Sequence, residues 1–248
     1  EGVHSGGASG HVPSSFRIAR SLLSRLEDEK TGEILIDELN TEIPDYRIEE
    51  TKNLVSILNN EVVEEFPWKD NMKPSTKDNV EGVLRRTWKP AVSIVGVDGM
   101  PSTANAGNVL RPYTTLQLSM RIPPTTSAKK AVQAMKKTLS ENIPYDATVE
   151  LQFEKAGEGW NAPESKPWLL EAIDKASKEY FGQVACSMGE GGSIPFMGML
   201  GKQFPEAQFV ITGVLGPQSN AHGPNEFLHI PFAKRLSCCI SSVIAVYK

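Results

Sequence analysis

Residues 108–122, NVLRPYTTLQLSMRI, decide how the longer first part of this chain is expected to fold. Polar and apolar side chains alternate along their second half, with Thr115, Gln117 and Ser119 interleaved with Leu116, Leu118 and Met120. Such alternation is typical of a strand that buries one face. The composition around it predicts a strand at 89–99, a helix at 127–141 and a further strand at 147–153.

An amphipathic helix is predicted ahead of these elements, at residues 13–29. Its apolar side chains recur at helical spacing: Phe16, Ala19, Leu22, Leu23 and Leu26. The order helix, strand, strand, helix, strand is most of a ferredoxin-like two-layer α+β sandwich. The first strand of that fold is missing, and we expect it before Glu1. Residues 30–89 predict loops and short helices, the clearest of them at 47–60.

The Gly- and Pro-rich segment 154–167, EKAGEGWNAPESKP, predicts a boundary. Beyond it we expect helices and short strands in alternation: a helix at 168–181, a strand at 183–187, a helix at 194–204, a strand at 207–213 and a helix at 226–247. This order favours an α/β domain with a parallel or mixed sheet. Two strands are too few for such a sheet. We therefore expect one domain at 1–155 and part of another at 156–248.

The composition of the 248 residues excludes some classes of partner. Hydrophobic residues make up 40% and charged residues 23%, as in ordinary globular proteins, and the net charge is −4. An acidic balance argues against a nucleic-acid surface, and no apolar run of about 18 residues predicts a membrane span. The cysteines, Cys186, Cys238 and Cys239, lack the spacing of a zinc ribbon or disulfide framework, so we expect the reducing cytoplasm. Small molecules or proteins are the expected partners.

The loop GEGGSIP, residues 189–195, could bind an anion. Gly191 and Gly192 would let the backbone approach a ligand closely, and Ser193 stands at the predicted start of a helix. Free N–H groups at a helix start favour a carboxylate. The alternative is a plain tight turn in which Ser193 is the N-cap.

His222 lies in the polar turn SNAHGPNE, residues 219–226. A neutral imidazole suits a zinc ion, but a zinc site needs three or four ligands, and a surface histidine remains the alternative. His4 could be a second catalytic imidazole or the cap of a following helix. Arg121, near the end of the long strand, could hold a carboxylate with two hydrogen bonds or could be an edge-strand charge.

Five segments, in this order, resemble the second half of the metal-dependent dipeptidases of the carnosinase and cytosolic non-specific dipeptidase family: VHSGGASG (3–10), NVLRP (108–112), SMRIPP (119–124), GEGGSIPF (189–196) and AHGPNE (221–226). The resemblance implies a lid domain that mediates homodimerisation, inserted into a zinc-aminopeptidase-like α/β catalytic domain. It also implies two divalent metal ions, zinc in the first place and manganese as the second candidate.

The resemblance also implies roles for single residues. His222 would ligate one metal, and Ser193, Gly191, Gly192 and Arg121 would hold the substrate carboxylate. His4 would reach across the dimer to polarise the scissile carbonyl, with help from Asn108. The carnosinase branch has a histidine where Lys155 stands here, so the substrate contact at this position differs.

The expected function is hydrolysis of dipeptides or short peptides, with this chain as the lid and C-terminal catalytic part. The family's remaining metal ligands belong to an N-terminal half that we expect as a partner, and without it the isolated chain should be inactive. Two alternatives stay open: an N-acyl amino acid amidohydrolase of the same fold, and a non-catalytic dimerisation or binding module.

Overall fold

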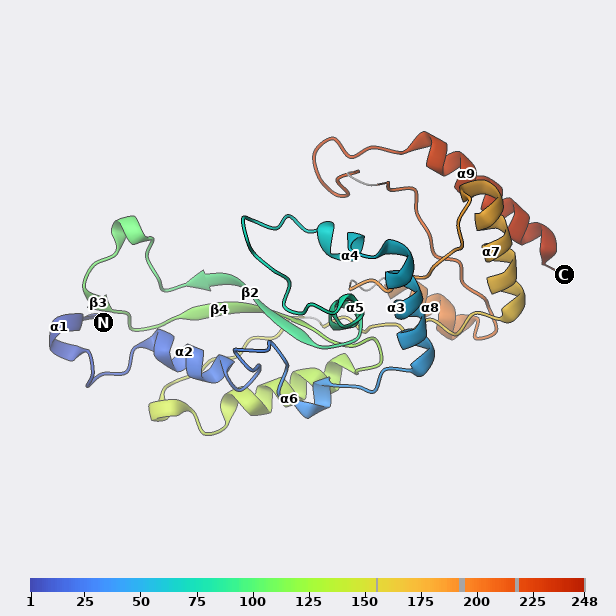
Figure 1. Ribbon diagram of the computed structural model, residues 1–248. Helices are drawn as coiled ribbons and strands as arrows, with labels where there is room; N and C mark the ends of the chain where they lie inside the picture. Colours follow the sequence, from blue (N-terminus) through green and yellow to red (C-terminus); the bar gives the residue numbers. More distant parts are fainter. Residues whose placement is uncertain (155, 192–194, 217–218, 248) are drawn as a thin grey trace. The chain divides into compact units, whose positions relative to one another are not determined.

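The computed structural model describes residues 1–154, 156–191, 195–216 and 219–247. The chain divides into two compact units, one comprising Glu1–Trp160 with Met188–Pro195 and the other Asn161–Ser187 with Phe196–Lys248 (Figure 1). The predicted boundary at Lys155 lies outside the described residues. No helix in the described ranges is long and apolar enough to cross a membrane.

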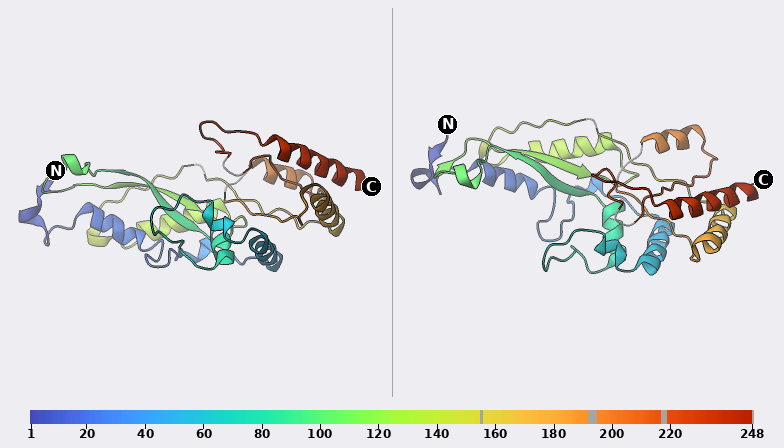
Figure 2. Two further views of the ribbon diagram at one scale, coloured as in Figure 1. Left: turned by 45° about the horizontal axis from the view of Figure 1, so that its top comes forward. Right: turned by 90° about the horizontal axis from the view of Figure 1, so that it is seen from above.

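A two-stranded antiparallel sheet and two helices form the centre of the first unit. Strand β2, Ala91–Asp98, pairs with β4, Thr115–Arg121, with a register irregularity between Ile94 and Gly96. Helices α2, Ser15–Leu23, and α6, Ala128–Ser140, pack on this sheet (Figures 1 and 2). The predicted α+β arrangement of helices on a sheet is therefore present in this unit.

The core between helices and sheet contains the apolar side chains that the periodicity predicts. Leu118 and Met120 of β4 pack against it, as their alternation with polar residues requires. The buried members of this core are Leu22, Leu26, Ile34, Ile36, Leu39, Ala131, Ala134, Met135 and Leu139.

The predicted long strand at 108–122 is two strands in the structure. β3, Val109–Leu110, pairs with β1, Val3–His4, and only β4 joins β2. Pro112 lies between β3 and β4 and has no N–H to donate to a ladder. Ser15 binds the chain on both sides of Pro112: its Oγ donates to the Arg111 carbonyl at 3.1 Å and lies 2.8 Å from Thr114 Oγ1.

The strand predicted at 147–153 is wrong as an assignment, since no described segment pairs with it. Val149 and Leu151 nevertheless pack against the core, as the alternation of the segment predicts. Alternation reports which side chains are buried, whereas a strand also needs a hydrogen-bonded neighbour.

The sequence between α2 and β2 forms a small helical subdomain. Its helices are α3, Asp45–Leu58, α4, Glu61–Glu64, and α5, Asn79–Thr87. Leu54, Val62 and Val83 are its buried core. The helix predicted at 47–60 is α3. The remaining short elements of this unit are α1, Ser5–Ala8, and the 3-10 turns η1, Asp37–Leu39, η2, Thr103–Asn105, and η3, Pro144–Asp146.

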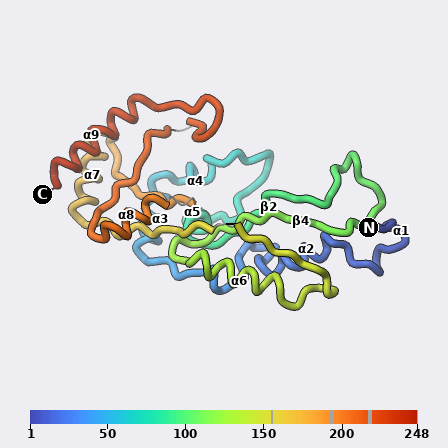
Figure 3. Tube along the Cα trace, turned by 180° about the vertical axis from the view of Figure 1, so that it is seen from behind, coloured from blue at the N-terminus to red at the C-terminus, as the bar shows by residue number. Residues whose placement is uncertain are grey.

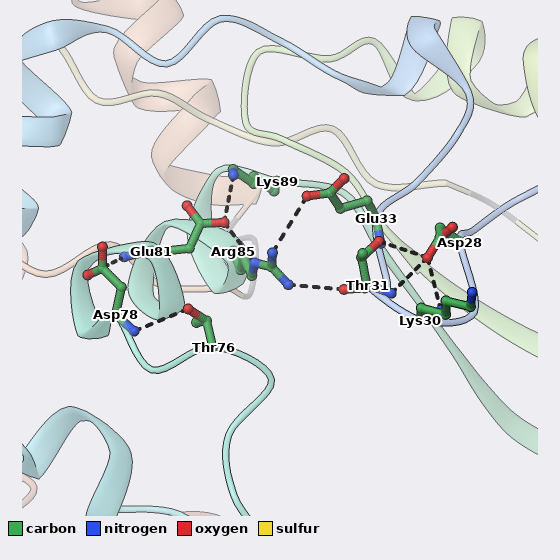
Figure 4. Close-up of polar contacts among 9 residues, drawn as sticks. All are labelled: Asp28, Lys30, Thr31, Glu33, Thr76, Asp78, Glu81, Arg85 and Lys89. Atoms are coloured by element: carbon green, nitrogen blue, oxygen red, sulfur yellow. Dashed lines mark hydrogen bonds and ion pairs between the residues drawn. The ribbon is translucent and has the colours of Figure 1, made fainter.

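Charged side chains attach α5 to the turn at 28–33 (Figure 4). Glu81 Oε1 accepts from Arg85 Nε and Lys89 Nζ, both at 2.7 Å, and Arg85 Nη1 donates to the Thr31 carbonyl at 3.1 Å. Arg85 Nη2 also lies 3.6 Å from Glu33 Oε1. Burial raises the pKa of Glu81, but the hydrogen bonds and charges of Lys89 and Arg85 outweigh burial and lower it below its ordinary value.

The second unit contains α7, Pro167–Phe181, most of α8, Pro195–Gln203, and α9, Ile230–Val246, all close to their predicted positions. α7 and α9 lie side by side (Figure 3), with Phe181 and Phe232 ring centroids 5.1 Å apart. The strands predicted at 183–187 and 207–213 are wrong, because neither joins a ladder among the described residues.

Candidate functional site

The short β1–β3 ladder brings His4 close to Asn108, although the two residues lie more than 100 positions apart in the sequence. His4 lies opposite Val109 in the ladder, and the Ser5 N–H donates to the Asn108 carbonyl at 2.8 Å. Gly2 permits this close approach, because a Cβ at that position would lie 2.6 Å from Val109 Cγ1. The roles of Gly2 and Ser5 were not predicted from the sequence, where the only signal is a glycine directly before the motif that begins at Val3.

His4 is exposed, and one of its ring nitrogens is already in use. Its Nδ1 accepts a hydrogen bond from the Gly6 N–H at 3.1 Å, so His4 caps the four-residue α1. Accepting at Nδ1 requires the neutral ring to carry its proton on Nε2. The cap therefore fixes a tautomer whose Nε2–H can donate to an external acceptor such as a polarised carbonyl oxygen.

Arg121 is the last residue of β4 and lies opposite Ala91 in the ladder. Its side chain is exposed and makes no hydrogen bond or ion pair to any described residue. Pro123, two positions later, is fully buried, so the backbone is anchored just beyond the exposed Arg121 side chain. An anchored backbone with a free guanidinium is suited to binding a carboxylate through two hydrogen bonds.

The structure describes only part of the GEGGSIP loop, and Gly192 and Ser193, like Lys155, lie outside the described residues. Gly191 and Gly189 both run close to α5. A Cβ on Gly191 would lie 3.1 Å from the Arg86 carbonyl, and one on Gly189 would lie 3.1 Å from Thr87 Cγ2. The close approach of this loop to α5 therefore explains the two glycines without a bound ligand.

The turn around His222 has an uncommon backbone. Asn220, His222 and Asn225 have φ of 55°, 59° and 59°, in the left-handed region that a histidine seldom occupies. Hydrogen bonds within the turn hold it: Asn220 Nδ2 donates to the Pro224 carbonyl at 2.6 Å, the His222 N–H donates to Glu226 Oε2 at 3.1 Å, and the Gly223 N–H donates to the Asn220 carbonyl at 2.9 Å. The exposed imidazole makes no hydrogen bond to a described residue. Such a conformation, held by its surroundings, is often found at functional sites.

His4, Asn108, Arg121 and Gly191 belong to the first unit and His222 to the second. Of these, only His4 and Asn108 are joined by contacts in the described structure. No group of three or more His, Cys, Asp or Glu side chains that could hold a metal ion occurs in the described ranges. A zinc site takes three or four protein ligands, and His222 is a single candidate for one of them.

Comparison with known proteins identifies relatives of the chain. The family model for the M20 peptidase dimerisation domain matches residues 1–147. A cysteinylglycine-S-conjugate dipeptidase of Corynebacterium striatum is 28% identical over 153 residues, which are 59% of this chain and 33% of that protein.

Solved structures share the fold over almost the whole chain. Human carnosine dipeptidase 1 matches 99% of this chain with a TM-score of 0.68 and 18% identity. The dipeptidase Dug1p of Saccharomyces cerevisiae matches 100% with a TM-score of 0.66 and 22% identity. The M20 family metallo-carboxypeptidase Sso-CP2 of Sulfolobus solfataricus matches 98% with a TM-score of 0.69 and 18% identity.

The chain spans 53%, 52% and 54% of the lengths of these three structures. It spans a third of the curated relative from Corynebacterium striatum. The family match covers more than half of the chain and contains the β1–β3 ladder as well as the sheet of β2 and β4. This chain therefore belongs to the M20 peptidase family, and residues 1–147 are its dimerisation domain.

Proposed function

We propose that this chain is the dimerisation domain and the C-terminal catalytic part of a metal-dependent dipeptidase. The observation that carries the proposal is the pairing of His4 with Val109 and of the Ser5 N–H with the Asn108 carbonyl, which places His4 beside Asn108 and leaves His4 Nε2 as a free donor inside a peptidase dimerisation domain. A dipeptidase among the relatives supports dipeptides or short peptides as substrates. Residues 156–248 would be part of a zinc-aminopeptidase-like catalytic domain.

Each candidate residue has one task in this proposal. Arg121, with Gly191, Gly192 and Ser193, binds the C-terminal carboxylate of the substrate and so fixes the scissile bond. His4 donates its Nε2–H to the carbonyl oxygen of a substrate bound by the other subunit of a homodimer, where negative charge develops. Asn108 supports His4 through the shared ladder.

Two divalent ions, zinc in preference to manganese, would supply Lewis acidity and an activated water. His222 would hold one of them, since its imidazole is exposed in a constrained turn. The other ligands would come from an N-terminal half outside this chain, which is why no complete ligand group is expected within it. The free cysteines support the cytoplasm as the compartment.

A second function is favoured by one observation. Because residues 1–147 match a dimerisation domain, the alternative is that this chain acts as a non-catalytic dimerisation or binding module. An N-acyl amino acid amidohydrolase would use the same carboxylate-binding residues, and only a substrate comparison separates it from a dipeptidase.

The test uses the full-length protein and its His222→Ala variant. We expect wild type with added zinc or manganese to hydrolyse dipeptides faster than N-acyl amino acids. His222→Ala should lose bound metal, measured by mass spectrometry, and lose activity by about 100-fold or more, because a ligand is removed from a small set.

His11→Ala is the matched control, since His11 is exposed and its side chain has no described partner; it should keep metal and activity. Unchanged metal content and turnover in His222→Ala would contradict the metal role. Preferential hydrolysis of N-acyl amino acids would instead favour the amidohydrolase.

A further inference from the structure

The outer face of α2 forms one side of a cavity in the first unit that the proposed function does not use. Leu22 faces the core, whereas Arg17, Arg20, Ser21 and Ser24 line the cavity. Their spacing of three, four and seven residues puts them on one face of the helix. Pro144 and Tyr145 of η3 line the opposite side, and the cavity, which is open to solvent, has a volume of about 350 Å³.

The two arginines of this cavity lack an internal counter-charge. Neither the Arg17 nor the Arg20 guanidinium forms an ion pair or side-chain hydrogen bond with a described residue. The unit's other arginines on helices differ, since Arg47 binds Glu50, Arg85 binds Glu81 and Arg86 binds Glu65. Two like charges three residues apart on a helix repel each other, so an external anion between them would be stabilising.

The opposite side of the cavity is held in place by a third arginine of the same segment. Arg25 Nη1 donates to the Glu141 carbonyl at 2.6 Å, and Arg25 Nη2 donates to the Asn142 carbonyl at 2.6 Å. These bonds fix the chain just before η3. The cavity is therefore built from two segments more than 100 residues apart that a specific side chain clamps together.

Tyr145 has an uncommon conformation for an aromatic residue. Its φ is 60° and its side chain is exposed, with 64% of the residue accessible. Asn, Asp and Gly adopt the left-handed backbone region more easily than tyrosine does, so the conformation of the turn does not explain the tyrosine at this position. At the edge of the cavity its ring and hydroxyl can contact a ligand, and Asp146 beside it in sequence does not line the cavity.

We propose that this cavity binds a phosphate group, as inorganic phosphate or as a small phosphomonoester. A tetrahedral dianion can accept from both guanidinium groups and from the Ser21 and Tyr145 hydroxyls, whereas a carboxylate is satisfied by a single arginine. The volume lies at the lower end of the range for small-molecule sites, which leaves room for a small organic group beside Tyr145. The site is separate from the residues assigned to peptide hydrolysis.

Calorimetric titration of the full-length protein with inorganic phosphate, phenyl phosphate and acetate tests the proposal. We expect saturable binding of at least one phosphate compound and none of acetate at the same concentration. Tighter binding of phenyl phosphate would identify a phosphomonoester as the ligand, and equal affinities would identify free phosphate. The double variant Arg17→Gln/Arg20→Gln should weaken binding by at least tenfold.

Two variants control for charge and for folding. Lys234→Gln/Arg235→Gln removes the same number of positive charges, two, from exposed positions on α9 and should change affinity less than twofold. Ser21→Asp keeps both arginines but puts a carboxylate into the cavity, and it should also abolish phosphate binding while the melting temperature stays within a few degrees. Absence of phosphate binding in wild type, equal binding of acetate, or wild-type affinity in the Ser21→Asp protein would each overturn the proposal.

Discussion

Arg25 shows how one side chain fixes the relation of two helices. Its guanidinium donates to three carbonyls at the end of α6, those of Thr138, Glu141 and Asn142. The last carbonyls of a helix have no partner within the helix, and the helix dipole favours a cation there. Arg25 itself lies two residues beyond the end of α2, so it links the C-terminal ends of both helices.

Replacing Arg25 by alanine should lower the free energy of unfolding by about 2–3 kcal/mol, since hydrogen bonds from a charged donor are removed. Arg25→Lys should recover less than half of the lost free energy of unfolding, because an ammonium group cannot donate to the same carbonyls in the geometry of a planar guanidinium. Urea unfolding followed by circular dichroism measures both. Arg17→Ala, within α2 and without a described side-chain partner, should stay within about 0.5 kcal/mol of wild type. Equal losses in Arg17→Ala and Arg25→Ala would argue against the clamp.

Helix α5, like the end of α6, is attached to a distant segment by an arginine side chain. Its own turns form locally, with Asp78 accepting from the Val80 and Glu81 N–H groups as N-cap. Its attachment to the turn at 28–33 depends on Arg85, which is oriented by Glu81 (Figure 4). That turn is ordered by Asp28, whose pKa is lowered by hydrogen bonds from the Thr31 and Lys30 N–H groups.

The lowered pKa of Glu81 predicts a dependence of stability on pH. A carboxylate whose pKa is lower in the folded protein stabilises it fully above the ordinary value of about 4.3, and this contribution is lost as pH falls through the lowered value. Glu81→Gln should therefore be less stable than wild type by about 1–2 kcal/mol at pH 7. The difference should shrink below pH 4.

Urea midpoints of wild type and Glu81→Gln, measured between pH 3 and 7, test this expectation. Glu49→Gln is the control, because it removes only an exposed pair with Lys52 on α3 and should cost no more than about 0.5 kcal/mol. A difference between wild type and Glu81→Gln that stays constant down to pH 3 would show that the Glu81 charge does not act through these contacts.

At the scale of the whole molecule, the candidate residues are divided between the two units. His4 belongs to the dimerisation domain and His222 to the second unit. In the proposed homodimer, His4 of one subunit serves the substrate held by the other. Each active site would then require residues from both subunits.

Mixing two inactive full-length variants tests this arrangement. After subunit exchange, His4→Ala and His222→Ala should recover about a quarter of wild-type activity, because half of the dimers are mixed and half of their sites are whole. Dipeptide hydrolysis measures the recovery, and size-exclusion chromatography verifies that dimers persist. Each variant incubated alone is the control. Proven exchange without recovery would mean that His4 works within its own subunit or has no catalytic role.

The longer helices, the buried face of β4 and the motifs of the family could be predicted from the amino-acid sequence alone. α3, α6, α7 and α9 lie close to their predicted positions because helical hydrogen bonds join residues four apart, so the pattern and the bonds lie in the same segment. Leu118 and Met120 could be assigned to the core for a similar reason, since side-chain alternation is a local property.

The pairing of segments and the contacts between distant residues could not be predicted from the sequence, because they form only in the folded chain. A ladder bond joins residues far apart in sequence, so alternation along 108–122 could not show that β3 pairs with β1 while β4 pairs with β2. For the same reason it could not show that 147–153, 183–187 and 207–213 lack a partner among the described residues. The contact of Ser5 with Asn108 and the Arg25 clamp are likewise interactions between segments about 100 or more residues apart, and their geometry exists only once the chain has folded.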